Sequence, residues 1–345
     1  MEKEQGLKGY IRQNRAELFR EIEDLIQNED VTDIEWDGYY LWVTDLKKGC
    51  YCHNIRLNEE YVDNLAIRLA NIMKVPFNRA YPILEANTED LRISIWHESR
   101  CTKKSMAIRK IPTRLRFRHQ DIVQAGYAPE ALINLLENCV TAHCNIVIGG
   151  QPHAGKTELL KYLSTFIPAN EKVGVYEDNQ EIHYRKINPN KKCVEFFVDD
   201  KITYPDIIKA GLRHNIDWIL LSESRGPEVA HLLNSLSTGS YCMTTMHLDD
   251  VRDTPDRMYN MLGSSNINER FINSIYKYID LVILIECDKH EKRRIKQVGF
   301  LSRENGNNQC TIIYEDGSFT DEKIPETIIN KFSKKGIMNI YEKVN

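Results

Sequence analysis

The sequence predicts an α/β protein in which a larger domain, built on a mainly parallel sheet flanked by helices, follows a smaller α+β domain. Its 345 residues are long enough for about two domains. Between residues 129 and 285, helical stretches and buried strand-like runs follow one another, which is typical of a parallel sheet. The first 110 residues instead mix amphipathic helices with short strands rich in aromatic residues.

The smaller domain is expected over residues 1–112, and its first element is a helix. Within residues 9–28, apolar side chains recur at helical spacing on one stripe, with charged residues opposite. Two short strands, 33–36 and 39–44, are predicted next, joined by the Asp37-Gly38 turn as a hairpin.

A second amphipathic helix and a second pair of strands complete the smaller domain. The helix is predicted from the stripe Val62, Leu65, Leu69 and Ile72. After a loop containing Pro76 and Pro82, residues 91–96 and 105–109 have the composition of strands.

Residues 110–122 combine a proline with several Lys and Arg residues and have no clear period. We therefore expect this segment to link the two domains, with the larger one over residues 113–345.

The larger domain begins with a helix after Pro129 and continues as a series of apolar runs that end in polar residues. The runs expected to form strands are 145–149, 172–177, 216–222, 241–246 and 280–285. Residues 293–320 then carry strand-like segments around Asn305-Gly306 and Asp316-Gly317 turns, and a last helix is expected near 324–332.

The segment after the first of these runs predicts a nucleotide site. Residues 150–157, GQPHAGKT, fit G-x-x-x-x-G-K-[ST] between a strand and a helix, which is the P-loop (Walker A) pattern. Backbone N–H groups of such a loop bind phosphates, Lys156 is expected to reach the β and γ oxygens of ATP, and Thr157 to bind Mg²⁺. The expected nucleotide-binding residues are Gly150, Gln151, Pro152, His153, Ala154, Gly155, Lys156, Thr157 and Glu158. The alternative is a glycine loop that only turns the chain.

Charged and polar groups follow three further strands. Glu177 ends one run, Glu223 follows another with Arg225 two residues later, and His247 follows a third. Carboxyl ends of parallel strands form the ligand-binding edge of open α/β sheets, so these side chains are candidates for catalysis. Taken singly, each acidic residue could equally cap a helix or lie in solvent.

These motifs together resemble the type II/type IV secretion-system traffic ATPase superfamily. In that family, the segments GQPHAGKT, VYEDNQE, DWILLSESRG and TGSYCMTTMH correspond to the Walker A, Asp box, Walker B and His box motifs. The likeness covers about residues 15–300 and is greatest to the type IV secretion and tight-adherence pilus branch. It implies a RecA-like motor domain behind a sensor-like N-terminal domain.

The resemblance also assigns roles to the candidate residues. It implies Lys156 and Thr157 on phosphates and Mg²⁺, Glu223 near the metal and catalytic, and His247 as a sensor, with Arg225 beside them. Glu177 is the favoured water-activating base, although the choice between Glu177 and Glu223 stays open.

Arginines of the N-terminal domain complete the site in this family, and Arg92 and Arg109 occupy the matching places. A fixed cation would stabilise the charge that develops on the transferred phosphoryl group. The alternative is that both are exposed charges on strands.

Four residues depart from the family pattern: His153, Glu158, Ser222 and Ser240. The first two lie in or beside the P-loop, where many such loops have glycine and this family usually has a second Thr. Ser222 replaces a glycine before the Walker B glutamate, and Ser240 replaces a histidine of the His box. These departures put nucleotide affinity, rate or coupling in question without removing a charge from the proposed set.

Composition bounds the partners and the location. The net charge of −4 offers no global positive field, so we expect no stable nucleic-acid binding. The N-terminus has no apolar leader, and the apolar run 278–287 contains Asp280 and Glu286, so no transmembrane segment is expected. We expect a cytoplasmic protein, with any membrane attachment peripheral to the inner face.

The function that the resemblance implies is an ATP-hydrolysing traffic motor, working as a homo-oligomer, usually a hexamer, on an integral membrane platform protein. Two alternatives stay open. One is a P-loop motor that translocates nucleic acid, and the other is a degenerate nucleotide-binding switch with little turnover.

Overall fold

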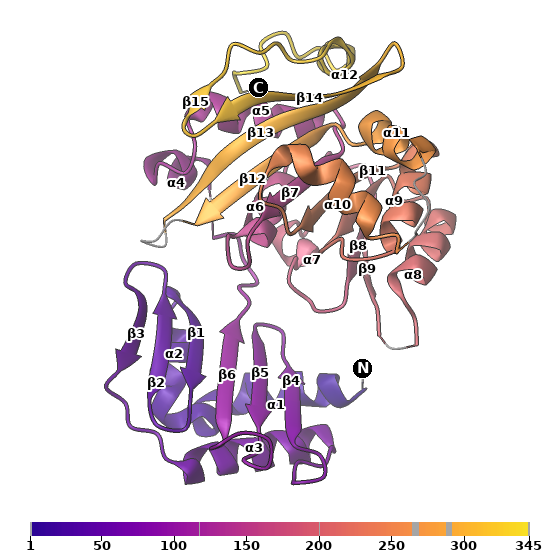
Figure 1. Ribbon diagram of the computed structural model, residues 1–345. Helices are drawn as coiled ribbons and strands as arrows, with labels where there is room; N and C mark the ends of the chain where they lie inside the picture. The colour runs from indigo at the N-terminus through magenta and orange to yellow at the C-terminus, as the bar shows by residue number, and fades with distance from the viewer. Residues whose placement is uncertain (1, 117, 200, 264–268, 288–291, 344–345) are drawn as a thin grey trace. The chain divides into compact units, whose positions relative to one another are not determined.

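The chain divides into two compact units, Met1–Thr113 (unit 1) and Arg114–Asn345 (unit 2), each with its own hydrophobic core (Figure 1). The computed structural model describes residues 2–116, 118–199, 201–263, 269–287 and 292–343. Phe117, in the predicted linker segment, lies outside the described residues.

Unit 1 is built on a six-stranded sheet in which every neighbouring pair is antiparallel, in the order β3-β2-β1-β6-β5-β4. Its strands are β1 (Val31–Trp36), β2 (Leu41–Asp45), β3 (Gly49–His53), β4 (Ile83–Asn87), β5 (Leu91–Trp96) and β6 (Ser105–Lys110). Apolar side chains alternate along the strands, and those of Ile34, Val43, Ile93 and Ile108 are fully buried. One face of the sheet therefore carries the core of unit 1.

Helices cover that face of the sheet. They are α1 (Glu2–Phe19), the 3₁₀ turn η1 (Arg20–Ile22), α2 (Glu23–Gln27) and α3 (Glu59–Met73). Figure 1 shows α1 and α3 on the same side of the strands, and the two helices contact each other. The predicted helix 9–28 is thus present, but it begins earlier and is interrupted where Arg20 takes a positive φ of 40°. Asn58 caps α3 by accepting a hydrogen bond from the N–H of Tyr61.

The predicted hairpin is present, but its second strand begins at Leu41 instead of Tyr39. The reason is local, because the carboxylate of Asp37 accepts hydrogen bonds from the N–H groups of Tyr39 and Tyr40 at 2.8 and 2.7 Å. That turn holds both residues out of the ladder. Strands β3 and β4 were not predicted.

Unit 2 contains a nine-stranded sheet in the order β15-β14-β13-β12-β7-β11-β10-β8-β9. Its strands are β7 (Ile146–Gly150), β8 (Val173–Glu177), β9 (Cys193–Phe197), β10 (Trp218–Leu221), β11 (Tyr241–Met246), β12 (Leu281–Cys287), β13 (Arg293–Glu304), β14 (Asn307–Glu315) and β15 (Ser318–Phe319). The six strands from β12 to β9 in that order pair in parallel, and β13 to β15 extend the sheet antiparallel. The predicted α/β class with a mainly parallel sheet is confirmed.

Helices flank both faces of this sheet. They are α4 (His119–Gln124), α5 (Glu130–Thr141), α6 (Lys156–Ser164), α7 (Tyr184–Ile187), α8 (Tyr204–Gly211), α9 (Glu228–Ser237), α10 (Thr254–Asn260), α11 (Glu269–Tyr278) and α12 (Glu326–Lys334), with 3₁₀ turns η2 (Leu212–His214) and η3 (Val251–Asp253). Side chains of α5, α6 and α12 share one core cluster with the strands, and those of α8, α9, α10 and α11 share the other. The sheet is therefore buried on both faces, as parallel sheets are.

The antiparallel strands join through tight turns that the sequence predicted. Asn305 and Gly306 between β13 and β14 have positive φ of 52° and 86°, and Asp316 and Gly317 between β14 and β15 have 46° and 96°. Two successive positive φ angles are those of the type I′ turn, which matches the twist of a hairpin.

No helix in the described part of the chain is both long and apolar enough to cross a membrane.

Candidate functional site

The predicted phosphate loop connects the end of β7 to the start of α6, and its backbone needs glycine at two places. A Cβ atom on Gly150 would lie 2.6 Å from the carbonyl oxygen of Ile285 on the neighbouring strand β12. Gly155 directly precedes α6 with a φ of 95°, a region that side chains disfavour. His153 also has a positive φ, 63°. The loop therefore keeps a left-handed conformation at a position where glycine is common.

Lys156 is nearly buried, and its ammonium group lies inside the loop. Its Nζ donates hydrogen bonds to the carbonyl oxygens of Gly150 and Gln151 at 2.9 and 3.0 Å. Burial lowers the pKa of Lys156, while the negative charges of Glu223 and Glu181 oppose that shift. Both carboxylates are therefore close enough to act on the ammonium group that we expect to bind phosphate.

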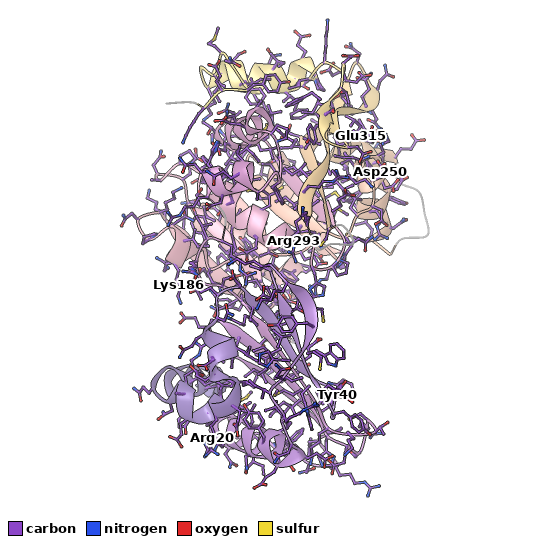
Figure 2. All side chains as sticks on the ribbon, turned by 90° about the vertical axis from the view of Figure 1, so that its left-hand side faces the viewer. Arg20, Tyr40, Lys186, Asp250, Arg293 and Glu315 are labelled. Carbon is purple, nitrogen blue, oxygen red and sulfur yellow. The ribbon has the colours of Figure 1, made fainter. Side chains whose placement is uncertain are left out.

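Two residues far along the chain brace the phosphate loop. The side-chain amide of Gln151 donates to the carboxylate of Asp249, and Nε of Arg293 donates to the carbonyl oxygen of His153 at 3.1 Å. Arg293 begins β13 and is labelled in Figure 2. Neither partner was among the predicted site residues. The sequence signals in those segments are the run of Lys and Arg residues at 292–294 and the acidic pair Asp249-Asp250 after His247.

The chain after His247 is also anchored to the antiparallel strands. Nε2 of Gln297 on β13 donates to Asp250 at 3.2 Å and to Glu315 at 2.7 Å. Arg252 pairs with the same two carboxylates, at 2.9 and 3.5 Å. The segment that follows β11 is therefore held in place by side chains of β13 and β14 and by an ion pair within its own turn.

Glu158, expected beside the nucleotide, has its side chain turned to another charge. Its Oε1 accepts from Nζ of Lys161 at 2.9 Å, and Lys161 is fully buried. Its Oε2 is buried and receives no hydrogen bond from the described residues. The two residues form an ion pair on the first turns of α6, in which Lys161 is fully buried and Glu158 is partly buried.

Glu177, the favoured base, is the most buried carboxylate of the site. Only 1% of its surface is exposed, and its Oε1 accepts hydrogen bonds from the N–H groups of Glu181 and Ile182 at 2.9 and 2.8 Å. Burial raises the pKa of Glu177 to about 8, against the effect of those two bonds. The carboxyl group is therefore committed to holding the loop that follows β8.

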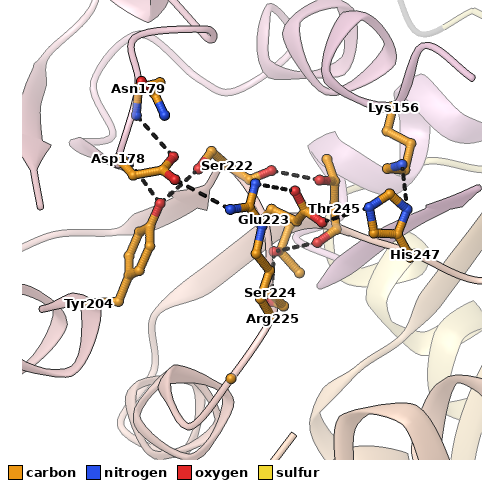
Figure 3. Close-up of polar contacts among 12 residues, drawn as sticks. Lys156, Asp178, Asn179, Tyr204, Ser222, Glu223, Ser224, Arg225, Thr245 and His247 are labelled. Atoms are coloured by element: carbon orange, nitrogen blue, oxygen red, sulfur yellow. Dashed lines mark hydrogen bonds and ion pairs between the residues drawn. The ribbon is translucent and has the colours of Figure 1, made fainter. Parts of the chain in front are cut away.

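Glu223 lies two residues beyond the end of β10 and contacts two cationic or titratable side chains (Figure 3). Its Oε2 accepts from Nη2 of Arg225 at 2.6 Å, which raises the pKa of that guanidinium, and Nη1 of Arg225 lies 3.4 Å from Asp178. Its Oε1 lies 3.1 Å from Nε2 of His247. Oε1 is otherwise buried and receives no hydrogen bond from the described residues.

His247 bridges the phosphate loop and Glu223 (Figure 3). Its Nδ1 lies 3.3 Å from Nζ of Lys156 and 3.3 Å from the carbonyl oxygen of Gly150. Its Nε2 faces Glu223 as described above. One imidazole therefore touches both the ammonium group of the loop and the carboxylate after β10.

The backbone that carries Glu223 is fixed by hydroxyl groups. Oγ1 of Thr245 donates to the carbonyl oxygen of Ser222 at 2.6 Å, and the hydroxyl of Ser224 lies 2.9 Å from that of Thr244. The hydroxyl of Ser222 lies 3.1 Å from that of Tyr204, which accepts from the N–H of Asp178. Ser222, a departure from the family pattern, thus takes part in the network around the site.

Ser240, the other departure in that region, lies away from these groups. It directly precedes β11, whereas His247 follows the last residue of that strand. Its hydroxyl donates to the carbonyl oxygen of Ile216 at 3.2 Å, before β10. It therefore belongs to the edge of the sheet opposite the phosphate loop.

The two predicted arginines lie in unit 1, next to each other. Arg92 on β5 and Arg109 on β6 are direct partners in the antiparallel register. Nε of Arg109 donates to Oδ1 of Asp33 on β1 at 2.8 Å. All three residues alternate with buried apolar neighbours and so lie on the sheet face away from the core of unit 1.

Comparison with known proteins finds a family. The family model described as "Type II/IV secretion system protein" matches residues 79–340, which include the phosphate loop, Glu177, Glu223 and His247. An uncharacterised protein of Bacillus anthracis is 26% identical over 317 residues, covering 87% of this chain and 71% of that protein.

Two solved structures share the fold. The ATPase DotB of Legionella pneumophila is 16% identical with a TM-score of 0.57, and the alignment covers 82% of this chain and 79% of DotB. The pilus retraction motor PilT, solved with bound ADP, is 17% identical with a TM-score of 0.57, covering 93% and 87%. At these identities the likeness shows a common fold.

Proposed function

Because the chain belongs to the type II/IV secretion system protein family, we propose that it is an ATP-hydrolysing motor that powers a bacterial secretion, conjugation or pilus assembly machine. The observation that carries this proposal is that the imidazole of His247 contacts two other site residues. Its Nδ1 lies 3.3 Å from Nζ of Lys156, and its Nε2 lies 3.1 Å from Oε1 of Glu223. A loop that only turned the chain would not need a buried lysine linked in this way to a carboxylate of another strand.

Nucleotide binding is assigned to the loop 150–157 and the start of α6. Backbone N–H groups at a helix N-terminus attract phosphate oxygens, and Lys156 adds a positive charge that can turn from the loop carbonyls to the phosphates. Gln151 and His153 need only hold the loop shape, since Asp249 and Arg293 already fix their positions.

The residues present fit a magnesium ion. Mg²⁺ prefers oxygen ligands and is usually bound through one or two protein groups together with substrate phosphates. The hydroxyl of Thr157 and the buried Oε1 of Glu223, which receives no hydrogen bond from the described residues, are oxygens of that kind. When bound, the ion would neutralise charge that develops on the phosphates.

For the hydrolytic step, Glu223 is favoured over Glu177. A water oxygen forms a bond to the γ-phosphorus, the bond from that phosphorus to the bridging oxygen breaks, and ADP keeps the bonding electrons. We assign Glu223 to orient this water and accept its proton, because it is connected to Lys156 through His247, whereas Oε1 of Glu177 already accepts from two backbone N–H groups. Glu177 keeps its loop in place, and His247 senses the phosphate by touching both Lys156 and Glu223.

The family membership supports the wider proposal. We propose that copies of the chain form a homo-oligomeric ring, most simply a hexamer. In this ring the positive charges of Arg92 and Arg109 would complete the nucleotide sites. Its partner would be an integral membrane platform protein, with the motor at the inner, cytoplasmic face of the membrane. The acidic net charge of −4 disfavours a nucleic-acid substrate.

The test is Mg²⁺-dependent ATP hydrolysis by the full chain over a range of protein concentrations, with Lys156→Ala as the blank. We expect specific activity that rises with concentration and disappears in the variant. Tight ATP binding with no turnover at any concentration would replace the motor by a nucleotide switch. Stimulation by polynucleotide that falls steeply with salt would replace it by a nucleic-acid motor.

A further inference from the structure

A pocket of about 310 Å³ opens on unit 2 beside the candidate site. Three of its lining residues, Glu223, Arg225 and His247, belong to the site described above. Ser224 lies between Glu223 and Arg225 in the same segment, and the remaining lining residues, Arg257, Asn260 and Met261, lie on or next to α10. Since one water needs roughly 10–15 Å³ of such space, the pocket is large enough for a tetrahedral oxyanion with its hydration water.

The wall of the pocket is also the wall of the expected phosphate site. His247 lies 3.3 Å from Lys156 on one side and 3.1 Å from Glu223 on the other, and both His247 and Glu223 line the pocket. The expected phosphate site and the pocket therefore share His247 and Glu223, and a phosphate ion that leaves Lys156 past these two side chains enters the pocket.

The lining carries a positive balance that suits an oxyanion. Arg225 is partly neutralised, because its Nη2 is bound to Glu223 at 2.6 Å. Arg257 is exposed, and its Nη2 donates to the carbonyl oxygen of His247 at a long 3.3 Å. A guanidinium has five N–H donors in a planar fork, so Arg257 keeps donors for a ligand while it stays attached to the residue that separates the two spaces.

We propose that this pocket, which we name the Arg257 pocket, binds the inorganic phosphate released by hydrolysis, apart from the nucleotide on the phosphate loop. The inference rests on the proposed function. Cleavage leaves two adjacent anions, ADP and phosphate, which repel each other beside the carboxylate of Glu223. Arg257 supplies a cation on the pocket wall toward which phosphate can move while ADP stays bound.

The decisive measurement is phosphate binding while the nucleotide site is full. The full chain is saturated with Mg²⁺ and a non-hydrolysable ATP analogue, so that the γ-phosphate position is occupied. Radiolabelled inorganic phosphate is then titrated by equilibrium dialysis at constant ionic strength. We expect one phosphate per chain, and binding at least tenfold weaker in Arg257→Gln, because charge-assisted hydrogen bonds are lost.

Two further variants test whether the weaker binding of Arg257→Gln comes from the pocket itself or from a general loss of positive charge. Arg252→Gln removes a nearby exposed arginine that pairs with Asp250 and Glu315 and does not line the pocket, and it should bind phosphate as the parent does. Arg257→Lys keeps the charge and should recover part of the affinity. Equal affinity in the parent protein and Arg257→Gln, or no phosphate bound to the analogue-loaded parent, would overturn the pocket assignment.

A second sample of the same purified protein, loaded with Mg²⁺ and ATP in place of the analogue, is assayed for ATP cleavage by chemical quench. Cleavage without phosphate binding to the analogue-loaded protein contradicts the Arg257 pocket alone. If ATP is not cleaved under any condition, although the analogue binds to the first sample, the proposed motor is contradicted. The two failures are thereby told apart.

Discussion

Glu177 and Glu223 have identical side chains and similar places in the sheet, but the surroundings of their carboxylates differ. Glu177 is the last residue of β8, and Glu223 lies two residues beyond the end of β10. Glu177 is 1% exposed and bound to two backbone N–H groups, whereas Glu223 meets Arg225 and His247. From the sequence both were candidates for the base, because strand-end position is all that a single sequence reports. The structure shows that Glu177 points into the loop that follows its own strand, whereas Glu223 points toward Arg225 and His247.

Glu177→Gln should change stability with pH. The folded-state pKa of Glu177 is raised to about 8 from an ordinary 4.5, so the folded protein holds a proton there that the unfolded chain has lost. Its contribution to stability is therefore full below pH 4.5 and is lost as the pH rises through 8, with a slope of up to about 1.4 kcal/mol per pH unit. The glutamine variant, which keeps an oxygen for both N–H groups, should be the more stable protein at pH 8 to 9, as measured by urea denaturation.

The matched variant is Glu223→Gln. If Glu223 activates water, its turnover should fall by roughly 100-fold or more while nucleotide binding persists, whereas Glu177→Gln should lose much less. A parallel pH dependence of stability in the parent and Glu177→Gln would contradict the buried, protonated state. Equal loss of turnover in both variants would contradict the division of roles.

At the scale of elements, α6 combines the phosphate loop with a partly buried ion pair. Its first residue is Lys156, and Glu158 and Lys161 pair three positions apart, where two side chains on a helix lie on the same face. The sequence suggested a nucleotide role for Glu158, since it follows Thr157 directly. The structure shows its carboxylate engaged with Lys161, a residue that helical spacing could have singled out.

Lys161→Met should destabilise unit 2 by about 3–5 kcal/mol, because it leaves the partly buried carboxylate of Glu158 without its cation. The double variant Glu158→Gln, Lys161→Met removes both charges and should recover most of that loss. Thermal unfolding with and without ATP checks both proteins. If the double variant is as unstable as Lys161→Met, the loss comes from packing and not from the stranded charge.

Other elements show how far local pattern determines structure. The type I′ turns at 305–306 and 316–317 were predicted because Asn-Gly and Asp-Gly supply positive φ without help from neighbours. Strand β9 was not predicted, although it pairs in parallel with β8 along five residues. Most of its side chains are only partly buried, and a connection that includes α7 separates it in the sequence from its partner β8. Residues 193–197 by themselves therefore show no strong strand pattern.

At the scale of the whole molecule, the two units carry different parts of the proposed mechanism. The groups that bind and cleave nucleotide lie in unit 2, and the arginines assigned as completing cations lie in unit 1 on neighbouring strands. Under the proposed function we therefore expect unit 2 to bind ATP by itself and turnover to depend on both units.

Arg92→Ala and Arg109→Ala should lower turnover by roughly 10³-fold if they act as arginine fingers, while nucleotide affinity stays nearly unchanged. Specific activity and ATP affinity, measured on the same preparations, check this expectation. Loss of affinity as large as the loss of turnover would count against the role.

Asp33→Asn is the control for Arg109. It removes the ion pair at 2.8 Å but keeps the guanidinium, so a purely structural role of Arg109 would reduce stability and turnover in both variants alike. We expect Asp33→Asn to keep most of the turnover. A deficit in Asp33→Asn equal to that of Arg109→Ala would assign Arg109 to folding of unit 1.

The sequence by itself determined the α/β class, the phosphate loop and the strand ends at which the polar groups stand. These features follow from local patterns: apolar runs, helix spacing, glycine at positive φ and the G-x-x-x-x-G-K-[ST] spacing. The tertiary structure alone decided that His247 touches both Lys156 and Glu223, that Glu177 is turned into its own loop, and that Arg293 and Arg257 reach the site. The contacts of Glu177 are local, with residues four and five positions later, but they depend on how the loop after β8 folds. The contacts of His247 with Lys156 and Glu223, and that of Arg293 with the phosphate loop, join residues that lie tens of positions or more apart, and the order of strands in the sheet, which no local pattern encodes, brings them together.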